Sequence, residues 1–235
     1  MTSDNASDIL GDGVFSYDAA KNILTINGDY TGDKSAISSY VDDLTIEVAG
    51  DCTFTATSRE TIIYALNGLT FTGGNLTLAS EAPDKDAIGI YVEHGTLYFK
   101  DANVDVTGDG FQYAITGEAE VALVIESSNI TASAHGEGCF KDFASMTLGG
   151  CYIDSPRGTV FENEALRDAE GNVIGGSSAT ETVVIKSGAD AIEGIDAAAG
   201  QSDIYDVAGR KLGSMSRGIN IVRSADGKTR KVLRK

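Results

Sequence analysis

Proline, tryptophan, histidine and long apolar runs are scarce or missing in this sequence. Its 235 residues include 2 prolines, no tryptophan and 2 histidines. No stretch approaches the roughly 20 apolar residues that a spanning helix needs, so we expect no membrane span. His94 and His135 stand at separate glycine-flanked corners, and neither has a Ser or Cys in a triad-like context. No catalytic set assembles, and the sequence favours a non-catalytic role over an enzyme.

Cysteine is also sparse and odd in number. The three residues are Cys52, Cys139 and Cys151, all in or beside predicted strands. Cys139 and Cys151 could meet across one coil of the fold described below, or each thiol could be buried as a small hydrophobe. With three cysteines, at least one is unpaired or bonds to another molecule.

Basic residues are few except at the C-terminal end. Residues 206–235 hold nine Lys or Arg and two Asp, which leaves 9 basic and 33 acidic residues, a net charge of −24, in residues 1–205. Phosphate groups are bound by clustered cations, so this composition argues against nucleic acid or an anionic membrane as partner. An acidic surface suits Ca²⁺, neutral sugars or simple solubility.

Glycine is abundant, at 28 residues, and it punctuates a repeat that runs from about Leu44 to Asn163. Each copy opens with a short alternating strand, and these strands begin at residues 44, 69, 97, 123 and 146. The starts are therefore 25, 28, 26 and 23 residues apart. Strands and polar corners repeated at this spacing are typical of a solenoid.

Two more strand-forming segments follow each opening strand. The second segments begin at residues 53, 76, 104, 130 and 152, and the third segments at 61, 87, 113, 139 and 159. Gly, Asn, Asp and Ser separate the segments, and none of the segments has helical periodicity. We therefore expect an all-β fold, a right-handed parallel β-helix with three strands per coil and about five full coils.

Three asparagines share one phase of the repeat. Asn75, Asn103 and Asn129 each fall four residues after the last apolar residue of an opening strand. Stacked coils would place their amides in one column, where each donates and accepts along the stack, although Asn is also common in turns. We expect a structural ladder that ends near Asp51 and Tyr152.

Every third segment contains an aromatic residue. These residues are Tyr64, Tyr91, Tyr113, Phe140 and Phe161. Facing outward they would form a platform for sugar rings, and facing inward they would fill the core. Inward stacking is the better interpretation for the phenylalanines, whereas the tyrosines are open because a phenol prefers one wet end. Tyr64, Tyr91 and Tyr113 are thus the candidate ligand-binding residues.

Acidic residues in the loops are candidate metal ligands. Asp84 and Asp86 lie two residues apart in the longest inter-strand loop, and Asp105 and Asp109 follow one coil later. Oxygen-rich loops suit Ca²⁺, but no loop of EF-hand type is present, and a solvated turn is the alternative.

The chain divides into four expected parts. They are an N-terminal segment or cap (1–21), the β-helix (22–196), a small-residue linker (197–203) and a basic C-terminal tail (204–235). In the tail, the segments IYDV, GINIVR and RKVL predict three short strands joined by glycine turns as a small meander.

The tail resembles the C-terminal sorting domains of Bacteroidetes proteins that use type IX secretion. The matching blocks are IYDVAGRKL at 204–212, SRGINIV at 216–222 and the basic KVLRK at 231–235. The resemblance implies export, a secreted or cell-surface location and recognition of the tail by secretion machinery. Met1 would then stand in place of an exported leader; the alternatives are a cytoplasmic protein and a tail that merely caps the solenoid.

The body is similar to bacterial carbohydrate-binding β-helix proteins, through core and corner positions such as those of residues 68–99. In that family, acidic loops bind Ca²⁺ and an exposed face binds polysaccharide. We therefore expect an exported, non-catalytic β-helix that binds polysaccharide or host or microbial glycans, or acts as a surface adhesin. The alternatives are a minimal or degenerate Ca²⁺-dependent polysaccharide lyase or hydrolase, and a purely structural surface protein.

Overall fold

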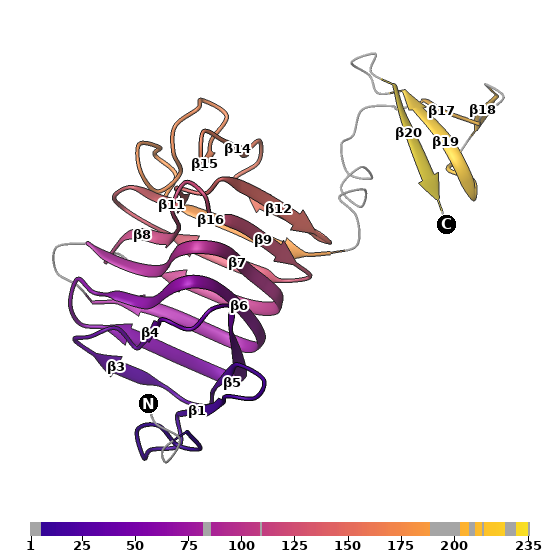
Figure 1. Ribbon diagram of the computed structural model, residues 1–235. Coiled ribbons are helices and arrows are strands. Elements are labelled where there is room, and N and C mark those ends of the chain that lie inside the picture. Colours follow the sequence, from indigo (N-terminus) through magenta and orange to yellow (C-terminus); the bar gives the residue numbers. More distant parts are fainter. Residues whose placement is uncertain are drawn as a thin grey trace. The chain divides into compact units, whose positions relative to one another are not determined.

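The computed structural model describes residues 6–81, 86–108, 110–188, 203–206, 210–212, 214–223 and 229–234. The chain forms two compact units, Met1–Asp190 and Ala191–Lys235. All regular structure in the described residues is β-strand (Figure 1). The expected linker lies largely outside the described residues.

The described residues of unit 1 form sixteen strands. They are β1 (Phe15–Asp18), β2 (Ile23–Ile26), β3 (Tyr30–Gly32), β4 (Ile37–Ser39), β5 (Leu44–Ala56), β6 (Thr61–Ser80), β7 (Ala87–Thr107), β8 (Phe111–Thr116), β9 (Ala122–Glu126), β10 (Asn129–Ser133), β11 (Gly138–Lys141), β12 (Ser145–Gly149), β13 (Cys151–Ser155), β14 (Val160–Glu162), β15 (Ala165–Arg167) and β16 (Thr182–Ser187). From β2 to β12 the coils stack with parallel pairing, as Figure 1 shows.

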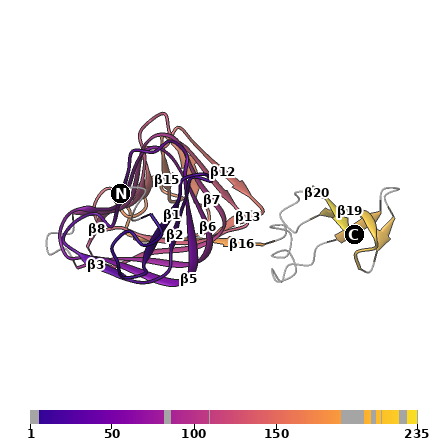
Figure 2. The same cartoon turned by 60° about the horizontal axis from the view of Figure 1, so that its bottom comes forward.

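The coils have three faces, which we name A, B and C. Face A consists of β2, residues 44–48 of β5, 69–73 of β6, 97–100 of β7, β9 and β12. Face B consists of β3, residues 51–56 of β5, 75–80 of β6, 103–107 of β7 and β10. Face C consists of β4, residues 61–65 of β6, 87–92 of β7, β8 and β11. Seen from the N-terminal end, these faces enclose a single core (Figure 2). The expected β-helix with three strands per coil is confirmed.

Alternation along each strand builds the core. On face A, Leu44, Ile46 and Val48 are buried, while Thr45 and Glu47 point outward. Equivalent residues of successive coils lie directly above one another, so the rings of Phe71 and Phe99 stack with centroids 5.2 Å apart and planes 9° apart. A column of large apolar side chains therefore runs through the middle of the solenoid.

The solenoid departs from the recognised repeat at both ends. A coil formed by β2, β3 and β4 precedes Leu44, within the range of 22–196 expected for the β-helix. At the other end, the segments at 152–155 and 159–163 do not continue the parallel stack. Instead β16 lies antiparallel between β10 and β13, and β15 pairs antiparallel with β11 and β14. Over these strands Phe143, Leu166 and Ile174 are buried, so this end is closed by a cap.

Unit 2 is a small antiparallel sheet. Its strands are β17 (Asp203–Asp206), β18 (Lys211–Leu212), β19 (Gly218–Arg223) and β20 (Thr229–Arg234), in the order β18-β17-β19-β20. The expected three strands are all present, and β18 adds a fourth at the edge beside β17. The three expected strands lie side by side in chain order, as β17-β19-β20, so the predicted meander is confirmed.

Candidate functional site

Tyr64 and Tyr91 occupy equivalent positions on face C. The strand register pairs Ser38 with Tyr64 and Tyr64 with Tyr91. In β6 the neighbours Ile63 and Ala65 are fully buried, so the period-2 alternation turns Tyr64 outward. The direction left open by the sequence is thus decided: both phenol rings stand half-buried on the outside of the solenoid.

A third ring extends this column toward the N-terminal end. Tyr40 follows β4 directly, two residues after Ser38, and its side chain is 72% exposed. The ring centroids of Tyr40 and Tyr64 are 5.9 Å apart with planes at 61°, and those of Tyr64 and Tyr91 are 5.7 Å apart at 54°. Three tyrosines from consecutive coils therefore form one column of neighbouring rings, with an edge-to-face contact between Tyr40 and Tyr64 and a tilted contact between Tyr64 and Tyr91.

Two glutamates hold the phenols of this column. The Tyr64 hydroxyl donates a hydrogen bond to Glu93, and the Tyr91 hydroxyl donates to Oε1 of Glu118 at 2.5 Å. Each glutamate belongs to the coil after its tyrosine, two residues beyond the next position of the column. We call Tyr40, Tyr64, Tyr91, Glu93 and Glu118 the tyrosine–glutamate strip. It presents phenol rings, together with carboxylate oxygens that can accept further hydrogen bonds.

The carboxylates change the acidity of both phenols. The hydrogen bond to Glu93 raises the pKa of Tyr64 to about 12, and burial adds to the shift. Burial, followed by the hydrogen bond to Glu118, raises the pKa of Tyr91 well above its ordinary value. In both cases the neutral phenol is stabilised because it donates to an anion, which a phenolate cannot do.

The strip therefore predicts a late tyrosine titration. In the unfolded chain these phenols ionise near pH 10, and in the folded chain Tyr64 ionises near pH 12. Their contribution to stability is complete below pH 10 and is lost as the pH rises toward and beyond 12. An ultraviolet titration of the native protein should show late-ionising phenols, of which Tyr64→Phe removes one and leaves Tyr91, and urea should shift all of them to about pH 10. A native titration in which every tyrosine ionises together near pH 10 would contradict this arrangement.

Tyr113 lies outside the column. In β8 the residue paired with Tyr91 is Thr116, whereas Tyr113 pairs with Ile88 and Gly138. Its ring lies under the Lys141 ammonium, at 5.4 Å from the centroid. The structure thus brings Tyr64 and Tyr91 together and separates Tyr113 from them. Phe140 points into the core, as expected. Phe161 is partly buried and packs against the core.

The acidic candidates are not gathered into a described metal centre. Asp84 and Asp109 lie outside the described residues. Asp86 forms an ion pair with Arg59, in which Nη1 and Oδ2 are 3.6 Å apart. Asp105 is exposed on face B. Within the described ranges there is no group of three or more His, Cys, Asp or Glu arranged to hold a metal ion. The calcium site therefore stays a prediction.

The asparagine column lies on face B. The register pairs Asn75 with Asn103 and Asn103 with Asn129, and Asp51 pairs with Asn75 at the N-terminal side. Asn75 donates to Asp51 Oδ1 at 2.5 Å, and Asn129 donates to Asn103 Oδ1 at 2.7 Å. Beyond Asn129 the column ends, because the Asn129 Oδ1 atom accepts hydrogen bonds from the backbone amide and hydroxyl of Ser187.

Histidines and cysteines have structural contacts of their own. His94 is exposed at a corner beside Glu120, at 2.7 Å, whereas His135 is mostly buried and lies 3.0 Å from Glu181. The two histidines at glycine-flanked corners therefore differ in their exposure to solvent. All three cysteines are free thiols. Cys139 is buried, and this burial raises the pKa of its thiol to about 12, so it is not a reactive thiolate.

Comparison with known proteins adds no assignment. No known protein family matches the chain, and neither a curated protein nor a solved structure matches it. A search of the described residues finds no helix with the length and apolarity to cross a membrane.

Sequence reasoning missed Tyr40, Glu93 and Glu118. Tyr40 belongs to the first coil, which precedes the recognised repeat. The glutamates carried a usable signal: Glu93 lies 29 residues after Tyr64, and Glu118 lies 27 residues after Tyr91. Both separations equal about one repeat plus two residues, which places each glutamate on the outward side of the next coil.

Proposed function

We propose that this protein binds polysaccharide, without cleaving it, along the tyrosine–glutamate strip on face C. The observation that supports the proposal is the column of Tyr40, Tyr64 and Tyr91 on the outside of consecutive coils, with carboxylates beside two of the phenols. Aromatic rings offer rigid apolar surface to the C–H faces of sugars, and they lose little conformational freedom on binding.

The polar groups of the strip favour a neutral polymer. Glu93 and Glu118 keep free acceptor sites after binding the phenols, and sugar hydroxyls can donate to them as charge-assisted hydrogen bonds. The carboxylates of a uronic acid polymer would be repelled by these glutamates and by the strongly negative charge of the solenoid. We therefore expect such a polymer to bind less well than a neutral one.

We place this activity outside the cell. The support is the resemblance of the tail to sorting domains, together with its folding as a compact unit of its own. On this proposal the solenoid binds the glycan and unit 2 serves export or attachment to the cell surface.

Removing two rings of the column is expected to weaken polysaccharide binding. Retention on affinity gels containing neutral glucans or mannans should fall by at least about tenfold in Tyr64→Ala/Tyr91→Ala, because central aromatic residues dominate the energy of most interfaces. A parallel assay for new reducing ends should show no cleavage by the native protein, and gels with uronate polymers should retain it less.

Tyr98→Ala is the matched control. Tyr98 also donates its phenol to a glutamate of the next coil, Glu126, but it stands on face A, away from this column of rings. Its replacement should leave retention unchanged. Equal losses in the control and the double variant, or no loss in either, would refute the assignment to face C.

A further inference from the structure

A row of polar side chains accompanies the tyrosines of the strip, at the corner where each coil turns from face C to face A. In three consecutive coils a polar residue follows the tyrosine by two or three positions, and these residues are Asp42, Asn67 and His94. The register pairs Asn67 with His94, and Asn67 Nδ2 donates to Asp42 Oδ1 at 2.8 Å. We call these three residues the corner row. Like the rings, the row advances by one residue per coil along the solenoid axis.

Strand pairing sets the spacing of both rows. Paired strands lie about 4.8 Å apart, and tilting of the rings brings their centroids to separations of 5.9 and 5.7 Å. One hexose unit of an extended chain covers a similar length. Each coil can therefore offer one ring and one polar group to one sugar.

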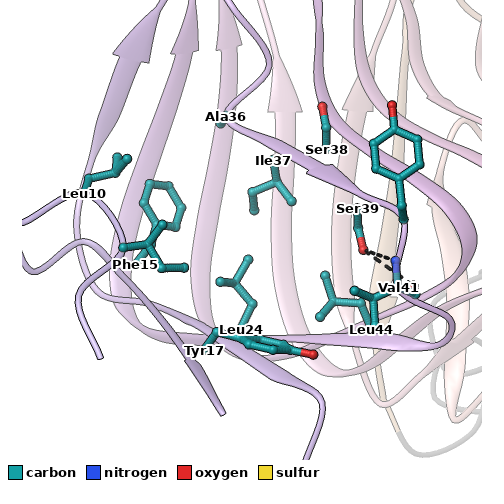
Figure 3. A pocket seen from close by; sticks show the side chains of 12 residues that line it. Leu10, Phe15, Tyr17, Leu24, Ala36, Ile37, Ser38, Ser39, Val41 and Leu44 are labelled. Atoms are coloured by element: carbon teal, nitrogen blue, oxygen red, sulfur yellow. Dashed lines mark hydrogen bonds between the residues drawn. The ribbon is translucent and has the colours of Figure 1, made fainter. Parts of the chain in front are cut away.

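The column of rings is bounded on both sides. Toward the C-terminal end, the position after Tyr91 is taken by Thr116, which is 4% exposed and donates its hydroxyl to the backbone oxygen of Lys141 at 3.0 Å. Toward the N-terminal end, Tyr40 stands in the first coil and borders an apolar hollow of about 350 Å³ (Figure 3). The other residues around this hollow include the core side chains Phe15, Leu24 and Ile37. Among the described residues, this column of rings therefore covers three coils.

We infer that the strip binds a linear, extended chain of β-1,4-linked neutral sugars, which lies along the solenoid axis with one sugar on each of the three coils. This inference rests on the proposed binding of polysaccharide and names the class of polymer. Equatorial linkages keep the successive sugars of such a chain in a straight ribbon, so that each can meet the next ring of the column. An α-1,4-linked glucan curves into a helix, and its successive sugars turn away from a straight row.

The two rows match the two kinds of surface that a sugar presents. The C–H face of a sugar is apolar and packs on a phenol ring, whereas its hydroxyls lie at the edge and need hydrogen-bond partners. In the corner row, the Asp42 carboxylate accepts hydrogen bonds, and the Asn67 amide and the His94 imidazole can donate and accept. His94 is 52% exposed, and Glu120 holds its Nδ1 atom at 2.7 Å. The edge of each bound sugar therefore has polar groups on one side of the rings.

Calorimetric titration of the full chain with cello-oligosaccharides and malto-oligosaccharides of increasing length tests this inference. The Kd for the β-1,4-linked series should fall by about tenfold from the disaccharide to the trisaccharide, because the third ring is then engaged. Beyond the tetrasaccharide it should change by less than about twofold, since the column offers no further ring. The α-1,4-linked trisaccharide should bind at least about tenfold more weakly than its β-1,4-linked counterpart.

Asn67→Ala should weaken binding of the β-1,4-linked trisaccharide by about three- to tenfold, through loss of one hydrogen-bonding group. Asn75→Ala is the matched control. Asn75 also donates to an aspartate of the preceding coil, Asp51, but it stands in the asparagine column of face B. Its replacement should leave the Kd unchanged. Equal losses in the two variants, or no loss in Asn67→Ala, would contradict a role of the corner row.

Failure of this inference differs from failure of the proposed function. The proposed function fails if the native protein retains no polysaccharide, or if Tyr64→Ala/Tyr91→Ala binds as the native protein does. The inference alone fails if retention depends on these rings but α-1,4-linked chains bind equally well, affinity keeps rising to the hexasaccharide, or the polymer binds and the trisaccharide does not. Should Asn67→Ala fail to fold, the length and linkage series on the native protein still decides.

Discussion

Phe71→Ala is expected to lower the free energy of unfolding of the solenoid by about 3–5 kcal/mol, the usual cost of removing a buried phenylalanine ring. Phe71 is fully buried in the middle of the stack, and its ring lies 5.2 Å from that of Phe99 on the next coil. The variant loses apolar burial and leaves a cavity that the neighbouring coils cannot close, because parallel pairing fixes their spacing. The stacking energy of the ring pair is lost in addition.

Urea denaturation followed by circular dichroism measures this effect. Thr70→Ala is the matched control, because Thr70 is the neighbour of Phe71 in β6 and points outward. Its replacement should change stability by less than about 0.5 kcal/mol. In a solenoid each coil contacts only its neighbours. Phe71→Ala should therefore also make unfolding less cooperative, because it weakens the contact between the central coils. A loss below about 1 kcal/mol would show that the core is looser than the ring stack implies.

Gly74→Ala is expected to destabilise the protein by about 1–3 kcal/mol or more, through overpacking between coils. A Cβ atom at position 74 would lie 2.1 Å from the carbonyl oxygen of Gly50 on the preceding coil. The Gly50 oxygen belongs to the backbone, and the new Cβ atom is fixed to the backbone of residue 74. No side-chain rotation can therefore relieve the clash, and the two coils must move apart at this corner. The clash alone causes the effect, since the backbone of Gly74 is not in the left-handed region.

Gly50→Ala is the control for that experiment. A Cβ atom at Gly50 meets no other atom within 4 Å, although the same two corners are involved. Its effect should be small, and a slight gain is expected because alanine restricts the unfolded chain more than glycine does. Thermal unfolding of the two variants should separate them clearly. Similar midpoints would mean that the corner between the coils is not closely packed.

The repeated core pattern was the part of the fold most accessible to prediction. Alternation such as that of residues 44–48 depends only on the period of a strand, and it is the same in every coil. The phase of Asn75, Asn103 and Asn129 likewise predicted their alignment, because one repeat corresponds to one turn of the solenoid. Strand boundaries were less predictable: β6 and β7 run without interruption around corners where the sequence suggested breaks.

The candidate site could be predicted only in part from the sequence. Tyr64, Tyr91 and Tyr113 were recognised as the aromatic residues of the third segments, but only Tyr64 and Tyr91 occupy equivalent positions in their coils. The pairing of β7 with β8, whose register shifts between Ala87 and Ile88, places Tyr113 beside Ile88 and Thr116 beside Tyr91. Tyr40 escaped notice because the first coil has short, irregular strands.

By itself, the sequence determined the class of this protein: a parallel β-helix with an acidic body, a basic C-terminal unit and an asparagine column. These features follow from local periodicity and composition, which do not depend on how one coil packs against the next. The tertiary structure alone decided three others: the outward direction and ring contacts of the tyrosines, the insertion of β16 between β10 and β13, and the cap over the C-terminal end of the solenoid. Each of these depends on contacts between residues 24 or more positions apart, whose register is set by how the coils pack.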